Sequence, residues 1–247
     1  LHSGTYGGGV ANPINIMSKL IASMHDENMK ITIPGFYDKV IDLNDKDKNE
    51  ILKGEINTNE FKNSIGIKEL YGDTDFSLTE RIATRPTLDV NGIYGGYTGE
   101  GSKTVLPSEA HAKISMRLVP KQDWKEISEL FKQYVLNFIP KSVTAKIKTH
   151  HGAEPYVTPT TSIAYEAAIL AYKKSFGVNP FQQRGGGSIP IVPIFEKELG
   201  VKSILMGFGL DSDAIHSPNE HFGLFNFFKG IETIIYFYEF YTSKINL

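Results

Sequence analysis

The strongest constraint on the fold of this chain is a regular alternation of apolar and polar residues between positions 111 and 119. Side chains alternate between the two faces of a β-strand, so this period predicts a strand with one face toward a core. The apolar face would carry Ala112, Ile114, Met116 and Leu118. The opposite face would carry His111, Lys113, Ser115 and Arg117. The pattern therefore places Arg117 on the polar side of a half-buried strand.

An amphipathic helix is predicted directly after this strand. Asp123 is suited to be its N-cap, and Pro140 is suited to end it, because proline disrupts a helix interior. The apolar residues between them recur at helical spacing and are Ile127, Leu130, Phe131, Tyr134 and Phe138. A further strand is predicted at 143–149.

The first half of the chain supplies the other elements of the same domain. Asn12 and Pro13 are typical of an N-cap and a first helical residue, and the spacing of later apolar residues extends this helix to about Glu27. The expected order is a strand that precedes or includes Leu1, this helix, short polar helices near 45–53 and 58–64, strands at 87–94 and 111–119, a helix, and a strand at 143–149. This order predicts the split β-α-β layout of ferredoxin-like domains, a two-layer α/β sandwich.

The pattern changes after residue 151. Helices are predicted at 161–176 and 193–199, a glycine-rich loop at 184–190, and a compact apolar strand at 201–206. Alternating helices and buried strands are typical of the end of a larger α/β domain. We therefore divide the chain into a domain at 1–150 and part of a second domain at 151–247.

The stretch 213–220 predicts the start of the last helix. Ser217 and Glu220 have the spacing of a capping box, and Pro218 falls at the first helical position, so the helix would run from here to Tyr241. His216 comes just before the cap, with two aspartates close by in sequence. A histidine held in this way suits a metal ligand, which needs a fixed ring orientation. An ordinary loop histidine is the alternative interpretation of these residues.

Composition excludes several classes of function. The chain has 247 residues, 40% of them hydrophobic and 22% charged, which predicts a packed globular protein. The net charge of -2 gives no basic excess for nucleic acid or an anionic membrane. The chain has no cysteine, so any metal must be held by His, Asp and Glu, a ligand set that suits zinc or manganese.

Neither end of the chain predicts a membrane segment. The aromatic stretch at 222–241 is interrupted by Lys229, Glu232 and Glu239, so it lacks the apolar span of roughly 20 residues that crosses a bilayer. The chain begins at Leu1 inside a glycine-rich motif, and no signal peptide is visible. We expect a fragment or processed product of a cytoplasmic protein.

Seven motifs resemble, in the same order, those of the carnosinase-like dipeptidases of the M20 metallopeptidase family. They are LHSGTYGGGVANP at Leu1, RPTLDVNGIYGG at Arg85, GEGSKTVLP at Gly99, ISMRLVP at Ile114, HGAEPY at His151, RGGGSIP at Arg184 and AIHSPNE at Ala214. The resemblance implies a zinc-peptidase-like α/β catalytic domain with two divalent metal ions, zinc or manganese. It also implies an inserted ferredoxin-like lid domain through which two subunits form a homodimer.

The same resemblance assigns roles to individual residues. His216 would be a metal ligand, and His2 would reach the partner subunit's active site and hydrogen-bond the oxyanion formed when water attacks the scissile carbonyl. Arg117 would bind the carboxylate of the substrate's C-terminal residue as a bidentate fork. Further substrate contacts would come from Thr104, His151, Arg184, Gly187 and Ser188.

The sequence also departs from the family's pattern. The family commonly has Glu where Gly185 stands, a change that loosens the loop. The family's remaining metal ligands and its general-base glutamate have no counterpart in this sequence. We therefore expect a dipeptidase whose chain, as given, is inactive by itself.

Two other functions stay open. Related enzymes remove acyl or succinyl groups from amino acids, so the substrate would be either a dipeptide or an N-acyl amino acid. Alternatively, the chain would serve as a dimerisation module without chemistry of its own.

Overall fold

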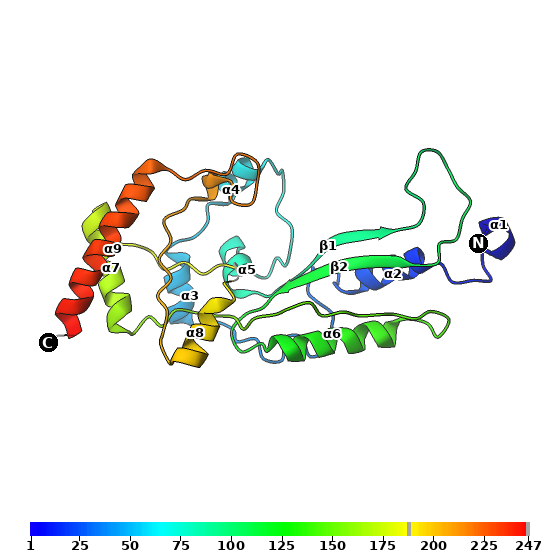
Figure 1. Ribbon diagram of the computed structural model, residues 1–247, viewed down its shortest axis with the longest axis horizontal. Coiled ribbons are helices and arrows are strands. Elements are labelled where there is room, and N and C mark those ends of the chain that lie inside the picture. The colour runs from blue at the N-terminus through cyan, green and yellow to red at the C-terminus, as the bar shows by residue number, and fades with distance from the viewer. Residues whose placement is uncertain (187–188, 246–247) are drawn as a thin grey trace. The chain divides into compact units, whose positions relative to one another are not determined.

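Figure 1 shows the computed structural model of the chain, which describes residues 1–186 and 189–245. Its internal contacts divide it into two compact units. Unit 1 comprises Leu1–Leu43, Tyr71–Pro155 and Gly185–Pro190. Unit 2 comprises Asn44–Leu70, Tyr156–Arg184 and Ile191–Leu247. The domain boundary expected at 150 stays a prediction, because contact grouping also assigns the polar segment 44–70 to unit 2.

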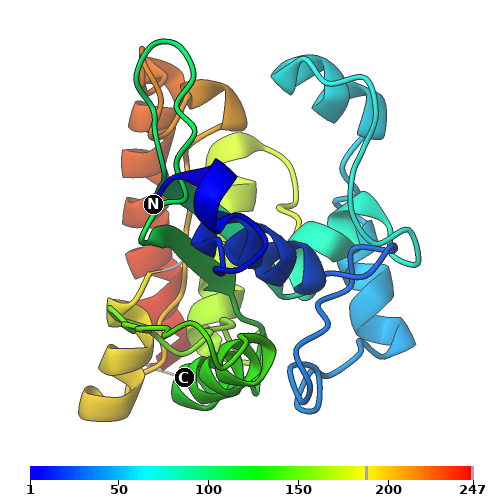
Figure 2. The same cartoon turned by 90° about the vertical axis from the view of Figure 1, so that its right-hand side faces the viewer.

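Unit 1 is built on an antiparallel pair of strands, β1 (Thr87–Gly95) and β2 (Ala110–Arg117). The strand predicted at 111–119 is confirmed and begins one residue earlier. In the pairing register Val90 lies opposite Ile114, and an irregularity follows between Val90 and Gly92. In Figure 2 the pair of strands β1 and β2 is seen along its length, with the N-terminal helix α1 toward the viewer.

Two capped helices accompany the strands in unit 1 (Figure 1). Helix α2 (Pro13–Ser23) begins where Asn12 accepts a hydrogen bond from the Ile14 amide, at 2.9 Å. Helix α6 (Trp124–Phe138) begins where Asp123 accepts hydrogen bonds from the amides of Lys125 and Glu126. Both predicted caps are therefore confirmed. The shorter helices of this unit are α1 (Ser3–Tyr6) and α5 (Leu78–Thr84).

Helix α2 ends at Ser23, and its predicted extension to Glu27 is wrong. Asp26 accepts hydrogen bonds from the Asn28 and Lys30 amides, each at 2.9 Å, and so forms a turn instead of another helical residue. Met29 takes a positive φ of 64° within that turn. The chain then doubles back to lie beside the end of the helix.

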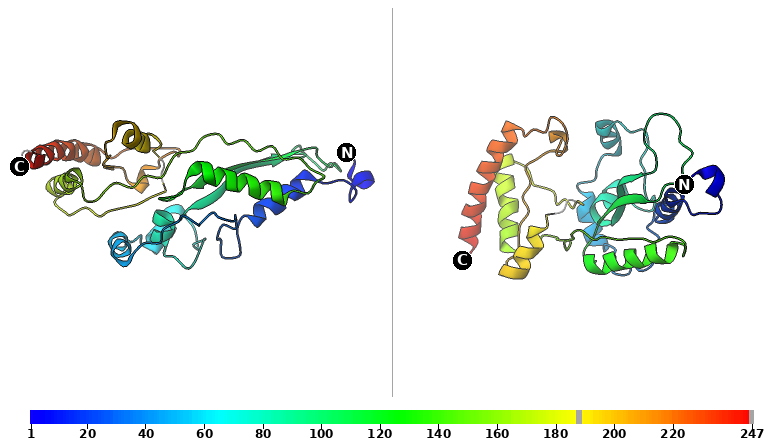
Figure 3. Two further views of the ribbon diagram at one scale, coloured as in Figure 1. Left: turned by 90° about the horizontal axis from the view of Figure 1, so that it is seen from below. Right: turned by 45° about the vertical axis from the view of Figure 1, so that its right-hand side comes forward.

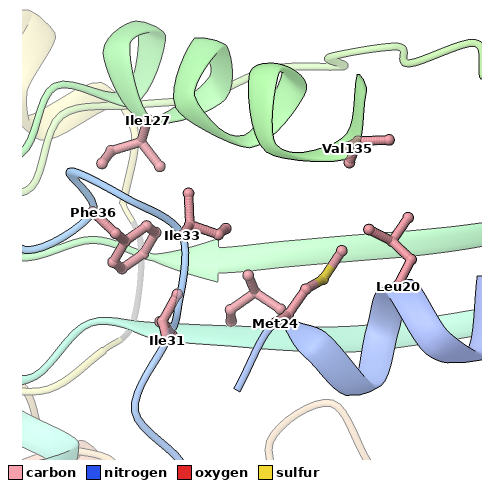
Figure 4. Close-up of a cluster of buried hydrophobic side chains, with 8 residues drawn as sticks. Leu20, Met24, Ile31, Ile33, Phe36, Ile127 and Val135 are labelled. Carbon is pink, nitrogen blue, oxygen red and sulfur yellow. The ribbon is translucent and has the colours of Figure 1, made fainter. Parts of the chain in front are cut away.

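The core of unit 1 joins α2, the returning segment, β1 and α6. Figure 4 shows Leu20 from α2 and Met24, the residue that follows this helix, on the side of the cluster opposite Ile127 and Val135 from α6, with Ile33 among them. The buried members of this cluster are Leu20, Met24, Ile31, Ile33, Phe36, Leu88, Ile127 and Val135. Each such side chain stabilises the fold by about 1.5–3 kcal/mol relative to an exposed position.

Two predicted strands of unit 1 are not paired among the described residues. Residues 143–149 keep the expected alternation, since Ala145 and Ile147 pack against the core, but the backbone joins no sheet. At the N-terminus, His2 forms only an isolated bridge with Val105. A segment forms a β-strand only when it pairs with a neighbouring backbone segment, and a pattern of buried side chains does not identify that neighbour. The α/β class is confirmed and the strand assignment at 143–149 is wrong, whereas the strand expected to precede or include Leu1 stays a prediction.

Unit 2 is mainly helical in the described residues. Its helices are α3 (Asp45–Leu52), α4 (Thr58–Ile65), α7 (Ile163–Phe176), α8 (Ile191–Leu199) and α9 (Leu224–Ile245), with a 3-10 helix at Asp211–Asp213. Figure 3 shows α7 and α9 packed side by side. Between them the hydroxyls of Ser175 and Thr233 lie 2.6 Å apart and are buried.

Two further predictions for unit 2 are wrong. Residues 201–206 form no strand; instead, the Tyr156 hydroxyl donates to the carbonyl of Ser203 and accepts from its amide, both at 2.9 Å. The last helix begins at Leu224, and not at the expected capping box. None of the helices in the described part of the chain is long and apolar enough to cross a membrane.

Candidate functional site

His2 lies at the start of α1 and beside Thr104. The Ser3 amide donates to the Thr104 carbonyl at 3.1 Å, next to the bridge between His2 and Val105. The structure therefore brings together two residues that the sequence assigned to the site, although 101 positions separate them. Both are exposed.

The ring of His2 has a defined hydrogen-bonding arrangement. Its Nδ1 accepts from the Gly4 amide at 3.1 Å, so in the neutral ring the proton lies on Nε2. A Cβ at Gly4 would approach the ring's Cε1 to 2.8 Å, so glycine lets the ring fold over the turn. Nε2 is then a hydrogen-bond donor, which is the form that an oxyanion requires.

Arg117 is the last residue of β2 and pairs with Thr87 across the ribbon. The glycine-rich loop lies against the aliphatic part of its side chain, since a Cβ at Gly186 would be 3.8 Å from Arg117 Cγ. A Cβ at Gly185 would meet nothing within 4 Å. The structure thus places a guanidinium-bearing side chain beside a loop that has open space above its backbone.

His151 is exposed and follows the extended segment that packs on the core of unit 1. The next residue, Gly152, lies directly against the indole of Trp124 at the start of α6. Nearby, burial raises the pKa of Glu154 above its usual value, and the Asp123 carboxylate raises this pKa further. The segment after His151 is therefore packed onto the first turn of α6.

The other predicted substrate contacts lie in the glycine-rich loop. Arg184 is half-buried and ends the second segment of unit 2. Gly187 and Ser188 lie outside the described residues, so their predicted roles stay predictions.

His216 lies in a loop of tight turns, and the predicted capping box does not form there. Ala214, His216 and Asn219 have positive φ angles of 56°, 61° and 64°, which a right-handed helix does not allow. The loop is organised by Asp213 instead, which is 3% exposed and accepts from the Leu210 amide at 2.8 Å. His216 itself is exposed.

The described residues alone do not form a metal site. No three His, Asp or Glu side chains gather there in a way that would hold an ion, and His216 therefore has no sufficient set of companion ligands. The imidazole of His221 lies beside Asp213, with its Nε2 3.9 Å from the aspartate's Oδ1. The described residues therefore contribute at most part of a ligand set.

Sequence reasoning missed three residues that support these positions. Asp213 shapes the loop of His216, Trp124 packs beside His151, and Gln122 is a fully buried side chain close to the end of β2. A buried aspartate within a loop has no periodic signal. The position of Trp124 directly after a capping Asp123 was visible in the sequence, but its contact with Gly152 depends on the tertiary fold.

Comparison with known proteins agrees with the motifs. The profile of a family described as the M20 "Peptidase dimerisation domain" matches residues 1–143. The Cys-Gly metallodipeptidase DUG1 of Candida albicans is 32% identical over 237 residues, which cover 95% of this chain and 49% of that protein. The human Beta-Ala-His dipeptidase is 27% identical over 240 residues, which cover 96% and 47%.

Among solved structures, the chain resembles an M20 family metallo-carboxypeptidase from Sulfolobus solfataricus. The TM-score is 0.87 at 32% identity, and the match covers 98% of this chain and 55% of that one. The chain thus spans about half the length of the curated relatives that it matches.

Proposed function

This chain belongs to the M20 peptidase family, and we propose that it supplies the substrate-binding and dimerisation part of a metal-dependent dipeptidase. Two of the relatives are described as dipeptidases, one acting on Cys-Gly and one on β-Ala-His. The proposal assigns the chemistry to a complete enzyme of about the relatives' length, and substrate recognition to residues of this chain.

The observation that carries the proposal is the placement of Arg117 against the glycine-rich loop. A dipeptide differs from an internal peptide segment by its free terminal carboxylate. A guanidinium binds a carboxylate through two parallel hydrogen bonds, and the backbone at Gly185 in this loop has open space beside it. Arg117 would therefore fix the substrate's C-terminal end.

His2 and Thr104 would act on the other subunit of a homodimer. They are adjacent in unit 1, which contains most of the matched dimerisation domain, and both are exposed. With its proton on Nε2, His2 would donate to the oxyanion in the partner's site, and Thr104 would contact the substrate there. His151, Arg184, Gly187 and Ser188 would complete the substrate contacts.

The relatives' descriptions as metallopeptidases support the use of divalent metal ions, with zinc or manganese as the metals that suit histidine and carboxylate ligands. His216 would be one ligand. The described residues alone do not fit a complete site, so the other ligands would come from outside them. A cytoplasmic location remains part of the same proposal.

The test is a hydrolysis assay with Cys-Gly, β-Ala-His and an N-acetyl amino acid, each with and without a chelator. This chain is compared with a form extended to the relatives' full length. We expect chelator-sensitive hydrolysis of dipeptides by the extended form only. Hydrolysis of the N-acetyl amino acid without any dipeptide cleavage would overturn the proposal.

The same assay tests Arg117 directly. Replacing Arg117 by Ala in the active form removes the carboxylate partner, so KM for dipeptides should rise about 10- to 100-fold. Lys103→Ala, which removes an exposed cation that lies 5.5 Å from the centre of the Tyr97 ring, is the matched control. An unchanged KM in Arg117→Ala would remove Arg117 from the site.

A further inference from the structure

The indole of Trp124 lies so close to Gly152 that no other residue fits there. A Cβ built on Gly152 would be 2.4 Å from Trp124 Cε3 and 2.5 Å from Cδ2. Real Cβ atoms do not approach to this distance, so the ring or the backbone would have to move. The backbone that follows His151 is therefore held against a rigid, flat side chain.

Gln122, two residues earlier, makes a second tertiary contact, through buried hydrogen bonds. It is 2% exposed, and both ends of its amide are satisfied. Its Oε1 accepts from the Val119 amide at 3.0 Å, and its Nε2 donates to the Phe36 carbonyl at 2.8 Å. Phe36 belongs to the core of unit 1. The end of β2, which carries Arg117, is thereby tied to that core.

We propose that the turn at 119–124 is a positioning element for substrate binding, in which Gln122 fixes Arg117 and Trp124 fixes His151. The inference rests on the proposed function, because it takes Arg117 and His151 as substrate contacts. Neither Gln122 nor Trp124 touches the substrate. They act by holding the backbone on which the two contact residues stand.

The packing of Trp124 on Gly152 is not explained by core filling alone. Gly152 is exposed, and Trp124 is only half-buried. Trp124 also has the Lys125 ammonium 5.7 Å from its ring centre, so the contact lies at the surface of unit 1. The Trp124 ring lies over an exposed glycine that is next to a candidate binding residue. Its contact with this glycine therefore fixes a backbone position more than it buries apolar surface.

The first experiment compares two glycine-to-alanine substitutions in the dipeptide-hydrolysing form of the protein. Gly152→Ala introduces the collision with Trp124. Gly207→Ala adds the same methyl group where nothing lies within 4 Å and φ is not positive. A displacement of about 1 Å at a binding residue lowers enzyme activity by up to ~100-fold. Gly152→Ala should therefore raise KM at least about 10-fold, with kcat changed less than about 3-fold. Gly207→Ala should change neither.

The second experiment asks whether Gly152 and Trp124 act as one unit. Trp124→Ala removes the ring and should itself raise KM, because the backbone after His151 loses its support. Adding Gly152→Ala to Trp124→Ala should have almost no further effect, because the collision no longer exists. Independent effects would instead add within about a factor of 2. Additive losses would overturn the role of the contact.

The third readout separates positioning from general destabilisation. Trp124 is the only tryptophan of this chain, so its fluorescence emission reports its packing directly. Gly152→Ala should shift the emission of this chain, whereas Gly207→Ala should not, with circular dichroism unchanged in both. A loss of helical signal together with the KM change would instead mean a merely structural effect and would overturn the proposal.

The role of Gln122 is tested by Gln122→Met, which keeps the side-chain volume and removes both hydrogen bonds. The control is Gln182→Met, the same substitution at a half-buried position of unit 2. Gln122→Met should raise KM for dipeptides and leave KM for a C-terminally amidated dipeptide unchanged, since only the former has a carboxylate for Arg117. If the wild-type enzyme cleaves no dipeptide, the proposed function fails. If it does and these variants behave like their controls, only the positioning role fails.

Discussion

The hydroxyl of Thr233 on α9 lies 2.6 Å from the hydroxyl of Ser175 on α7, and both side chains are buried. Each hydroxyl has a single proton, so one hydroxyl donates to the other and the second donates to a carbonyl of its own helix. The available carbonyls are that of Lys229, 2.6 Å from the Thr233 oxygen, and that of Ala171, 3.0 Å from the Ser175 oxygen. The pair is thus a buried polar contact between two helices that are also joined by the ion pair of Lys244 with Glu166 and by a hydrogen bond from the Lys229 ammonium to the Ser175 carbonyl.

Thr233→Val should lower the free energy of unfolding of unit 2 by about 1–2 kcal/mol, because a buried hydrogen-bonding group loses a partner while the volume is kept. Urea denaturation followed by circular dichroism measures this. Thr242→Val is the matched control on the same helix, since its exposed hydroxyl bonds only to the helix's own carbonyls. Equal losses in the two variants would contradict the role of the buried pair.

Arg85 should stabilise unit 1 mainly through its stacking and burial. Its guanidinium lies 4.2 Å from the centre of the Phe76 ring and 5.5 Å from that of Tyr37, and its side chain is 17% exposed. Arg85→Lys should therefore cost about 1–2 kcal/mol of unfolding free energy, because lysine lacks the planar fork and the stacking surface.

The ion pair of Arg85 with Asp42 supplies the control. The two are 2.9 Å apart, but the Asp42 side chain is 84% exposed. Water screens such a pair, so Asp42→Asn should cost less than about 1 kcal/mol. A larger loss in Asp42→Asn than in Arg85→Lys, measured by the same denaturation, would show that charge pairing outweighs stacking here.

Local sequence predicted most helices of this chain and the two paired strands β1 and β2, but it also predicted strands that do not pair. Asn12 and Asp123 cap helices within their own neighbourhood, so their signals are complete in a few residues. The segments 143–149 and 201–206 carry the composition of strands, but a strand also needs a paired backbone that composition does not identify. The capping box at Ser217 failed for a related reason, because the buried Asp213 organises that loop into turns.

Sequence motifs predicted individual residues of the candidate site, but not how these residues lie relative to one another. The motifs identified His2 and Arg117, but not that His2 lies beside Thr104 or that Gly186 packs on Arg117. Those relationships join residues that are far apart in the chain. Supporting residues such as Gln122 have no motif, because their role is set by what packs around them.

Unit 1 should lose stability as the pH falls below neutrality. Burial lowers the pKa of His25 below its usual 6.5, although the carboxylates of Asp89 and Asp26 oppose this in part. The unfolded chain then binds a proton at a higher pH than the folded chain. Stability from this group is therefore complete above about pH 6.5 and is lost as the pH falls through the lower folded pKa.

The measurement is the free energy of unfolding at about pH 8 and about pH 5, on either side of the histidine titration. The loss between the two should be smaller in His25→Gln than in the wild type. His150→Gln, at an exposed position, should keep the wild-type loss. A pH dependence that is identical in all three proteins would assign the effect to other groups.

His216→Ala should separate a binding role from a structural one. The side chain is exposed in its loop, and the loop is organised by hydrogen bonds of Asp213, so the substitution should change the unfolding free energy of this chain by less than about 0.5 kcal/mol. The residue's positive φ of 61° is tolerated less well by alanine than by asparagine, so His216→Asn is the matched second variant.

In the extended, active form both substitutions should reduce metal content, measured by elemental analysis, and reduce dipeptide hydrolysis at least about 100-fold, because a catalytic metal site needs about three protein ligands. Full metal content and full activity in both variants would identify His216 as an ordinary loop histidine.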